Sequence, residues 1–255
     1  MNRSIALTLL ATVATVAVAV SAAAYEVVTV TEGGAVTGKV VFRDTRPPMK
    51  KVIPTKSQEV CGKIHDEAQI VLSEDGGVQD TVVFLKGVKA GKAWDEAAKH
   101  AKLDNQGCKY VPRTQALPVG STLDIVNSDP ILHTVHGFAG ENTLFNKALW
   151  KAKVDSEPLA TAGLVRVDCD VHGWMRAWVY VVDSPYYATT DKDGAFTIKD
   201  VPPGDYTLVT WHEFTGVSER PVTVRAKESL SITADLKKQG ESPSVVQVVQ
   251  PLPPG

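Results

Sequence analysis

The sequence predicts a mainly β protein built from small β-sandwiches, and two observations support this expectation. Most apolar runs are short, rich in Val, Ile and Thr, and separated by Gly, Pro, Asp and Asn, which is typical of β-sandwiches. Helical patterns are scarce, because the best window, residues 93–103, combines good helix propensity with few apolar anchors. We therefore expect strands throughout, with one short surface helix in a connection.

The N-terminal segment has the pattern of an export signal. Arg3 supplies a positive charge, residues 5–20 form an apolar run, and Ser21 begins a stretch of small residues that suits cleavage. No stop-transfer pattern follows this run. We expect residues 1–24 to be a signal peptide that directs the chain to the periplasm, with no membrane span after cleavage. A retained span is the less favoured alternative.

The remaining chain has the composition of a globular protein with a polar tail. The formal net charge is −2, and Lys and Arg do not cluster into a stripe, so nucleic acid is not an expected partner. Residues 239–255 are rich in Ser, Pro, Gln and Val, and they predict an extended Pro-rich tail.

The strand candidates group into three blocks. Residues 25–90 predict an N-terminal β-module, residues 91–183 carry the motif described next, and residues 184–238 predict a second small β-sandwich. The candidate strands in chain order are 27–31, 38–42, 81–85, 122–126, 164–167, 177–182, 195–198, 206–211, 221–224 and 230–234.

The most informative motif is Cys169-x2-His172-x2-Met175, with His133 upstream. One thiolate, two imidazoles and one thioether are the donors of a trigonal copper site with a weak axial sulfur ligand. Zinc also accepts Cys and His, but it gains nothing from a Met at this spacing. The motif predicts a copper site made by these four residues, and the alternative is that they are ordinary buried side chains.

Strand periodicity supports this arrangement. Alternation along residues 164–169 places Cys169 on the inward face, and a short turn brings His172 beside it. His133 would come from the end of a separate strand. His136 is the rival upstream ligand, but positions 133 and 136 lie on opposite faces of a strand, so we expect only one to reach the metal.

The chain has three cysteines, and an oxidising compartment allows two of them to pair. Cys61 and Cys108 have no nearby ligand pattern, whereas Cys169 is followed by His and Met at +3 and +6. We therefore expect a disulfide between Cys61 and Cys108 and assign Cys169 to the metal. A different pairing, or an inert buried Cys169, remains open.

The middle block resembles the cupredoxin family. The resemblance lies in Asn-Ser-Asp-Pro-Ile-Leu-His-Thr-Val-His at 127–136 and in the compact Cys-His-Met loop, whose spacing is similar to that of amicyanin. It implies a cupredoxin-like Greek-key β-sandwich, as in amicyanin and plastocyanin, with one type 1 copper. Thr134 stands where many cupredoxins have Asn, and Gly173 stands where amicyanin has Pro. These differences affect the redox potential and the loop's rigidity rather than copper binding itself.

The last block resembles the carboxypeptidase regulatory-like domain. The resemblance rests on residues 190–208, where Asp193-Gly194 suits a hairpin turn and Pro203-Gly204 suits a second turn. The aspartates here lack the further acidic ligands of a calcium loop. As a whole, the chain is similar to periplasmic cupredoxin proteins that carry this domain, a group sometimes described as methylamine utilization proteins.

These observations predict a periplasmic carrier of single electrons. Its expected partners are redox proteins such as a c-type cytochrome or a periplasmic dehydrogenase, with the electron passing through His172. The alternative is a copper storage or assembly module whose β-domains mediate attachment. We do not expect an enzyme, because a second copper centre needs more histidines and the remaining ones are dispersed singly. These are His65, His100, His136 and His212.

Overall fold

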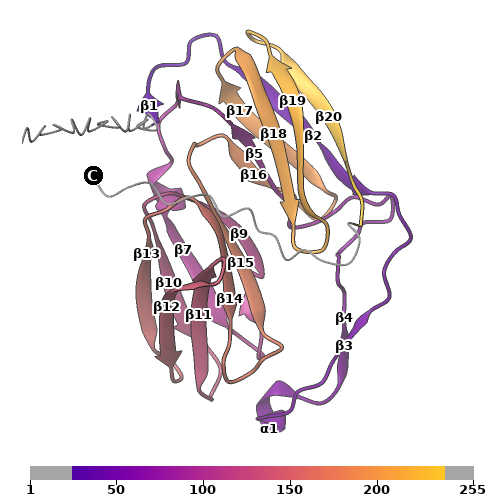
Figure 1. Ribbon diagram of the computed structural model, residues 1–255, viewed down its shortest axis with the longest axis vertical. Helices are drawn as coiled ribbons and strands as arrows, with labels where there is room; N and C mark the ends of the chain where they lie inside the picture. The colour runs from indigo at the N-terminus through magenta and orange to yellow at the C-terminus, as the bar shows by residue number, and fades with distance from the viewer. Residues whose placement is uncertain (1–24, 239–255) are drawn as a thin grey trace, which may run out of the picture.

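Two β-sandwiches stack along the long axis of the molecule in the computed structural model, which describes residues 25–238 (Figure 1). Nearly all regular structure is strand, so the predicted mainly β, cupredoxin-like sandwich class is confirmed. The predicted signal peptide and Pro-rich tail lie outside the described residues. Within residues 25–238, no helix has the length and apolarity needed to cross a membrane.

The lower sandwich holds the ligand candidates and consists of a four-stranded and a five-stranded sheet. The first has the order β13 (Val154–Leu159), β10 (Ser121–Asn127), β7 (His100–Asn105) and β8 (Tyr110–Val111). The second has the order β12 (Asn142–Leu149), β11 (His133–Ala139), β14 (Gly163–Asp168), β15 (Arg176–Val182) and β9 (Thr114–Pro118). Strict alternation of buried residues along β10 shows one face turned to the core.

The upper sandwich combines strands from both ends of the chain. One sheet has the order β16 (Tyr187–Thr189), β5 (Val82–Lys86), β18 (Gly204–His212) and β19 (Gly216–Val224). The other has the order β17 (Ala195–Val201), β2 (Gly34–Phe42) and β20 (Ser229–Leu236). The prediction of a separate N-terminal module over 25–90 was therefore wrong. Its two main strands cannot bury their apolar faces alone and pair instead with the C-terminal block.

A long excursion between β2 and β5 runs down the side of the lower sandwich, as Figure 1 shows. It contains the two-stranded pair β3 (Lys50–Val52) and β4 (His65–Glu67), and between them the one-turn helix α1 (Gln58–Cys61). We call residues 50–67 the arm. The disulfide between Cys61 and Cys108 fastens its tip to the lower sandwich, with the pairing that the sequence predicted.

The helix expected over 93–103 is mostly absent. A 3-10 helix, η1 (Glu96–Lys99), occupies its centre, and β7 begins at the next residue. Pairing with β10 and full burial of Leu103 outweigh the weak helix propensity of this segment. The remaining strands, β1 (Glu26–Val27) and β6 (Ala90–Gly91), form a short parallel pair.

Arg113 connects both sandwiches and the arm. Its guanidinium forms an ion pair with Glu213 of the upper sandwich and with Glu67 of the arm at 2.8 Å. Trp178 of the lower sandwich also donates its indole N–H to the Glu213 carboxylate, at 3.0 Å. The Glu213 side chain is 17% exposed. Burial raises the pKa of Glu213, but its bonds to Arg113 and Trp178 outweigh burial and hold the pKa below its usual value.

Replacement of Arg113 by Ala is expected to lower the free energy of unfolding by about 2 kcal/mol, because the buried Glu213 carboxylate loses its cation. Partial exposure of the guanidinium keeps this cost below the ~3–5 kcal/mol of a fully buried pair. Urea unfolding measures the effect. Arg176→Ala, which removes the more exposed pair with Asp168, is the matched control and should cost about 0–1 kcal/mol. Equal losses in both variants would contradict the bridging role of Arg113.

Stability should also depend on pH through His212. Burial lowers the pKa of His212 to about 4 in the folded chain, against about 6.5 in an unfolded one. The unfolded state therefore binds the proton first as pH falls, and stability is lost between these two values. Between pH 7 and pH 5 we expect His212 to account for about 2 kcal/mol. Urea unfolding at the two pH values should show a smaller loss in His212→Gln, whereas exposed His100→Gln should keep the full loss.

Candidate metal centre

Three soft donor atoms meet at one end of the lower sandwich. His133 begins β11, Cys169 directly follows β14, and His172 lies in the turn before β15. The Cys169 Sγ lies 3.9 Å from His133 Nδ1 and 3.7 Å from His172 Nδ1, and the two Nδ1 atoms are 3.0 Å apart. The three side chains are at most 2% exposed. The structure thus brings together three of the four predicted ligands, each with its donor atom turned to a common centre.

The turn between β14 and β15 is folded tightly by its own backbone. The Met175 N–H donates to the His172 carbonyl at 2.9 Å, and the Cys169 N–H donates to the Met175 carbonyl at 3.3 Å. The His172 N–H points at the Cys169 Sγ, 3.4 Å away. Met175, the fourth predicted ligand, is 2% exposed and packs in the same core as Cys169. The compact spacing therefore brings positions 169, 172 and 175 into one loop.

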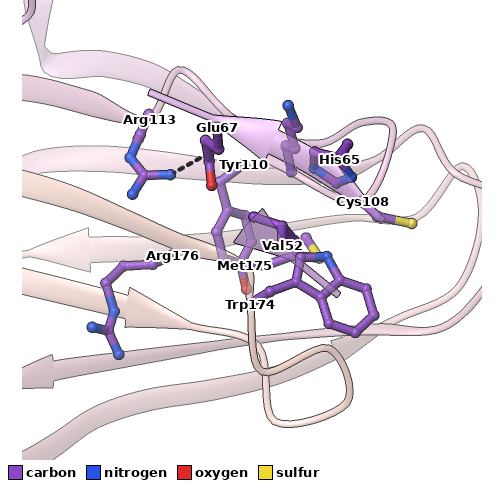
Figure 2. Close-up of a pocket in the computed structure, with 10 residues that line it drawn as sticks. Val52, His65, Glu67, Cys108, Tyr110, Arg113, Trp174, Met175 and Arg176 are labelled. Carbon is purple, nitrogen blue, oxygen red and sulfur yellow. Dashed lines mark hydrogen bonds and ion pairs between the residues drawn. The ribbon is translucent and has the colours of Figure 1, made fainter. Parts of the chain in front are cut away.

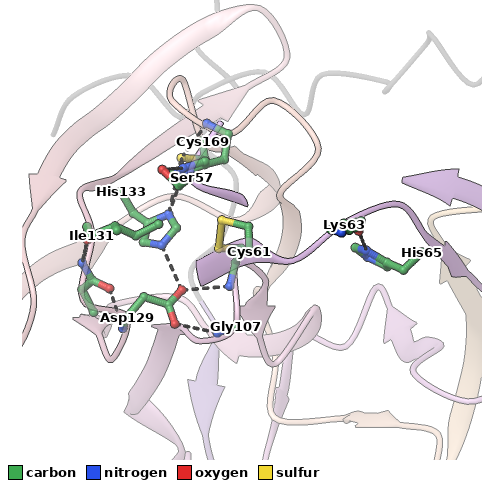
Figure 3. Close-up of a disulfide and its surroundings, with 12 residues drawn as sticks. Ser57, Cys61, Lys63, His65, Gly107, Asp129, Ile131, His133 and Cys169 are labelled. Carbon is green, nitrogen blue, oxygen red and sulfur yellow. Dashed lines mark hydrogen bonds and ion pairs between the residues drawn. A yellow bond between two sulfur atoms is a disulfide. The ribbon is translucent and has the colours of Figure 1, made fainter. Parts of the chain in front are cut away.

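His133 is oriented from behind by a carboxylate. Its Nε2 lies 2.9 Å from the Asp129 Oδ2, and an ionised carboxylate only accepts, so the ring hydrogen is on Nε2. This assignment leaves the Nδ1 lone pair facing Cys169. Asp129 also accepts the backbone N–H groups of Gly107 and Cys108, at 2.7 and 2.8 Å (Figure 3). The carboxylate is thus fixed by the loop that carries half of the disulfide.

His172 is completely buried. Its Nε2 lies 3.4 Å from the hydroxyl of Ser57 at the start of α1, and the Trp174 ring packs edge-on against it at 5.1 Å. Burial and the neighbouring His133 lower the pKa of His172 to about 4, so the ring is neutral at pH 7 and keeps a lone pair for a metal. The sequence suggested His172 as the edge through which an electron passes, but in the structure this edge is not exposed and Ser57 of the arm lies beside it.

Thr134 supports the thiol. Its hydroxyl lies 3.7 Å from the Cys169 Sγ and accepts the Asp170 backbone N–H at 2.6 Å. Burial raises the pKa of the Cys169 thiol, but its contacts with the His133 ring, Thr134 and the His172 backbone N–H outweigh burial and lower the pKa overall. Thr134 therefore ties the loop of Cys169 to β11.

His136 stands outside the cluster. Its Nδ1 lies 3.0 Å from Asp170 Oδ1, and its Nε2 lies 2.9 Å from Thr143 Oγ1. Both ring nitrogens are occupied on the other face of β11, as strand alternation predicts. His133 is therefore the upstream histidine of the cluster.

Two residues of the site were not identified from the sequence. Asp129 lies four positions before His133, and its place in the Asn-Ser-Asp-Pro segment was the only available signal. Ser57 is distant in the chain, so no local pattern indicated it. A second group of potential ligands, Cys108, Asp129 and His133, adjoins the first, but Cys108 is committed to its disulfide.

A cavity of about 60 Å³ lies between the arm and the lower sandwich, beside the ligand loop. Figure 2 shows Trp174 and Met175 from the loop on its wall, together with the ion pair of Arg113 and Glu67. Cys108 also lines it. The arm therefore covers this end of the sandwich without packing tightly along its whole length.

Solved copper proteins are similar to part of the chain. A purple cupredoxin from Nitrosopumilus maritimus is 22% identical over 32% of this chain and 99% of its own, with a TM-score of 0.30. Amicyanin from Paracoccus versutus is 20% identical over 39% and 97%, with a TM-score of 0.31. A copper-containing nitrite reductase from Thermus scotoductus is 18% identical over 33% of this chain, with a TM-score of 0.31, and only 22% of the reductase is covered.

One family model matches residues 158–232, and its description is polysaccharide lyase family 4, domain II. The match begins in β13 of the lower sandwich and ends in β20 of the upper one. It covers under half of the chain and differs from the carboxypeptidase regulatory-like resemblance noted for this region. No curated protein matches the chain.

Replacement of Thr134 by Val is expected to destabilise the protein by about 1 kcal/mol, because the Asp170 N–H loses its acceptor. The same change removes a hydrogen bond to Cys169, so the thiol pKa should rise. Urea unfolding and the pH dependence of the thiolate's ultraviolet absorbance measure the two effects. Thr134→Ser keeps the hydroxyl and should retain most of both properties. A Val variant that matches the wild type in both measurements would contradict this role.

Proposed function

We propose that the protein binds one type 1 copper ion per chain and carries single electrons. The observation that supports this most directly is the convergence of Cys169 Sγ with the Nδ1 atoms of His133 and His172. A thiolate and two imidazoles are donors that such a site takes, and Met175 in the same loop would supply the weak sulfur ligand. When copper is bound, it supplies a centre that accepts and releases one electron.

The hydrogen-bond partners of the two imidazoles suit a metal between them. Asp129 holds the hydrogen of His133 on Nε2, so the short contact between the two Nδ1 atoms requires a proton on His172 Nδ1. With a metal held by Nδ1, His172 would carry its hydrogen on Nε2 instead. The Ser57 hydroxyl beside this nitrogen can either donate or accept, so it serves both arrangements. The residues present therefore fit a copper ion without rearrangement of the outer partners.

The scaffold favours electron transfer over storage. The donors come from two adjacent strands and the turn between two paired strands, and all are buried. A hydrogen bond donated by Thr134 restricts the thiol, and a hydrogen bond accepted by Asp129 restricts the His133 imidazole. A site held in this way changes little between oxidation states, which keeps the reorganisation energy small. A storage site gains nothing from such rigidity.

We further propose a cellular setting for this carrier. The pattern of residues 1–24 favours export to the periplasm. The redox partners are then proteins such as a c-type cytochrome or a periplasmic dehydrogenase. We propose a carrier rather than an enzyme, because His65, His100, His136 and His212 belong to neither group of potential metal ligands found among residues 25–238.

Copper binding and visible absorption test the proposal. The chain loaded with Cu(II) should hold one copper per molecule, show an intense charge-transfer band from thiolate to copper, and be reduced and reoxidised reversibly. Cys169→Ser should lose the band. His136→Asn is the matched control, because this histidine lies outside the cluster, and it should keep the band.

The possible outcomes separate the two functions. Stoichiometric copper without the band, or labile Cu(I) binding without reversible oxidation, would support the storage or assembly module instead. A chain that binds no copper would refute both. A band that persists in Cys169→Ser would refute the assigned thiolate.

A further inference from the structure

The residues that contact the Nε2 atoms of the two candidate imidazoles, Asp129 and Ser57, are both hydrogen-bonded to cysteines of the same disulfide. Asp129, which holds His133 Nε2, accepts the backbone N–H of Cys108. Ser57, which lies beside His172 Nε2, accepts the N–H of Cys61 with its backbone carbonyl at 2.8 Å. The Cys61–Cys108 bond therefore joins the two structures that lie behind the ligands.

The same connection closes the edge of His172. This side chain is 0% exposed, and α1 at the tip of the arm approaches its outer nitrogen. Electron transfer between proteins requires close approach to an edge of the centre, so a cover at this place controls access for both protein partners and small molecules.

The arm has few other means of holding its tip in place. An isolated two-stranded pair and a one-turn helix are marginal elements by themselves. Ile53 and Ile64, which flank the tip, are 56% and 61% exposed. The ion pair between Glu67 and Arg113 holds the base of the arm rather than its tip. Val60 at the tip packs against the core of the lower sandwich, and the disulfide adds the covalent attachment.

We propose that the tip of the arm, residues 57–61, is a removable cover over His172, and that the Cys61–Cys108 disulfide is its latch. Reduction of the latch by a dithiol releases the cover and exposes the His172 edge. The role of this opening in electron transfer rests on the proposed function, whereas the cover itself requires no metal.

The chemistry of opening is ordinary thiol–disulfide exchange. A dithiol attacks one sulfur of the pair and forms a mixed disulfide, and its second thiol then displaces the remaining cysteine. Two electrons and two protons pass to Cys61 and Cys108, and the dithiol becomes a disulfide. Cys61 is 9% exposed, and Cys108 borders the cavity beside the arm, so local movement of the tip gives a thiolate access.

The test uses the full chain without added metal and diethyl pyrocarbonate, a reagent that modifies accessible imidazoles. Mass spectrometry follows each histidine with the disulfide intact, after reduction by dithiothreitol, and in the Cys61→Ser/Cys108→Ser variant. We expect His172 to react at least ten-fold faster in the reduced chain and in the variant. His100 is the exposed reference, and His212, buried in the upper sandwich, is the protected one.

Two controls keep the result specific. Ser57→Ala removes the hydroxyl but keeps the latch, so His172 should remain protected. Hydrogen exchange of β10 and β11 reports whether the lower sandwich stays folded. Unchanged protection of His172 after reduction would overturn the proposal. Loss of exchange protection in β10 and β11, in both the reduced chain and the variant, would also overturn it, because the disulfide would then support the sandwich rather than a cover.

The copper-loaded chain gives the functional readout. Its electron self-exchange rate should rise at least ten-fold in the Cys61→Ser/Cys108→Ser variant, because two molecules can then approach through their His172 edges. An unchanged rate alongside increased His172 reactivity would refute this edge as the route of transfer. Absence of copper binding would refute the proposed function while the imidazole test still decides whether the cover exists.

Discussion

Burial of three donor atoms at one end of a sandwich is the constraint that organises this structure. His133, Cys169 and His172 are at most 2% exposed, and polar groups removed from water are costly unless each finds a partner. Asp129, Thr134 and Ser57 supply those partners. Asp129 also fixes which ring nitrogen of His133 faces the centre. The same hydrogen bonds therefore supply partners for the buried polar groups and hold the donor atoms in place.

One of these three partners, Ser57, comes from a segment that connects two strands of the upper sandwich. Ser57 belongs to an excursion from the upper sandwich, so the cover of His172 is built from a part of the chain whose flanking strands, β2 and β5, lie in the other sandwich. Arg113 holds the base of that excursion between Glu67 and Glu213. The two sandwiches are thus coupled at both ends of the arm, by a charge network at the base and by a disulfide at the tip. The upper sandwich contributes to the site without supplying any of the predicted ligands.

The sequence predicted the ligand motif and the disulfide, but it did not predict which strands pair with partners that are distant in the chain. The mainly β class, the meeting of Cys169 and His172, and the Cys61–Cys108 bond follow from short patterns or from elimination among three cysteines. The choice of His133 over His136 rested on the resemblance to cupredoxins. The independent N-terminal module and the helix over 93–103 were wrong, because strand partners far away in the chain decide both. The cover of His172 escaped prediction for the same reason. A Ser at position 57 carries no signal until folding places it beside residue 172.

Burial of the centre and the proposed electron transfer make opposing demands, and the proposed cover reconciles them. Exclusion of water lowers the local dielectric and strengthens the hydrogen bonds that hold the donors in place. An electron, however, must leave through an edge that a partner can approach. A ligand loop packed deeper in the core would always exclude water, but no redox partner could then approach the edge. A cover made from one helical turn and fastened by one covalent bond keeps the donors dry, and its removal leaves β11, β14 and β15 intact because none of these strands pairs with the arm.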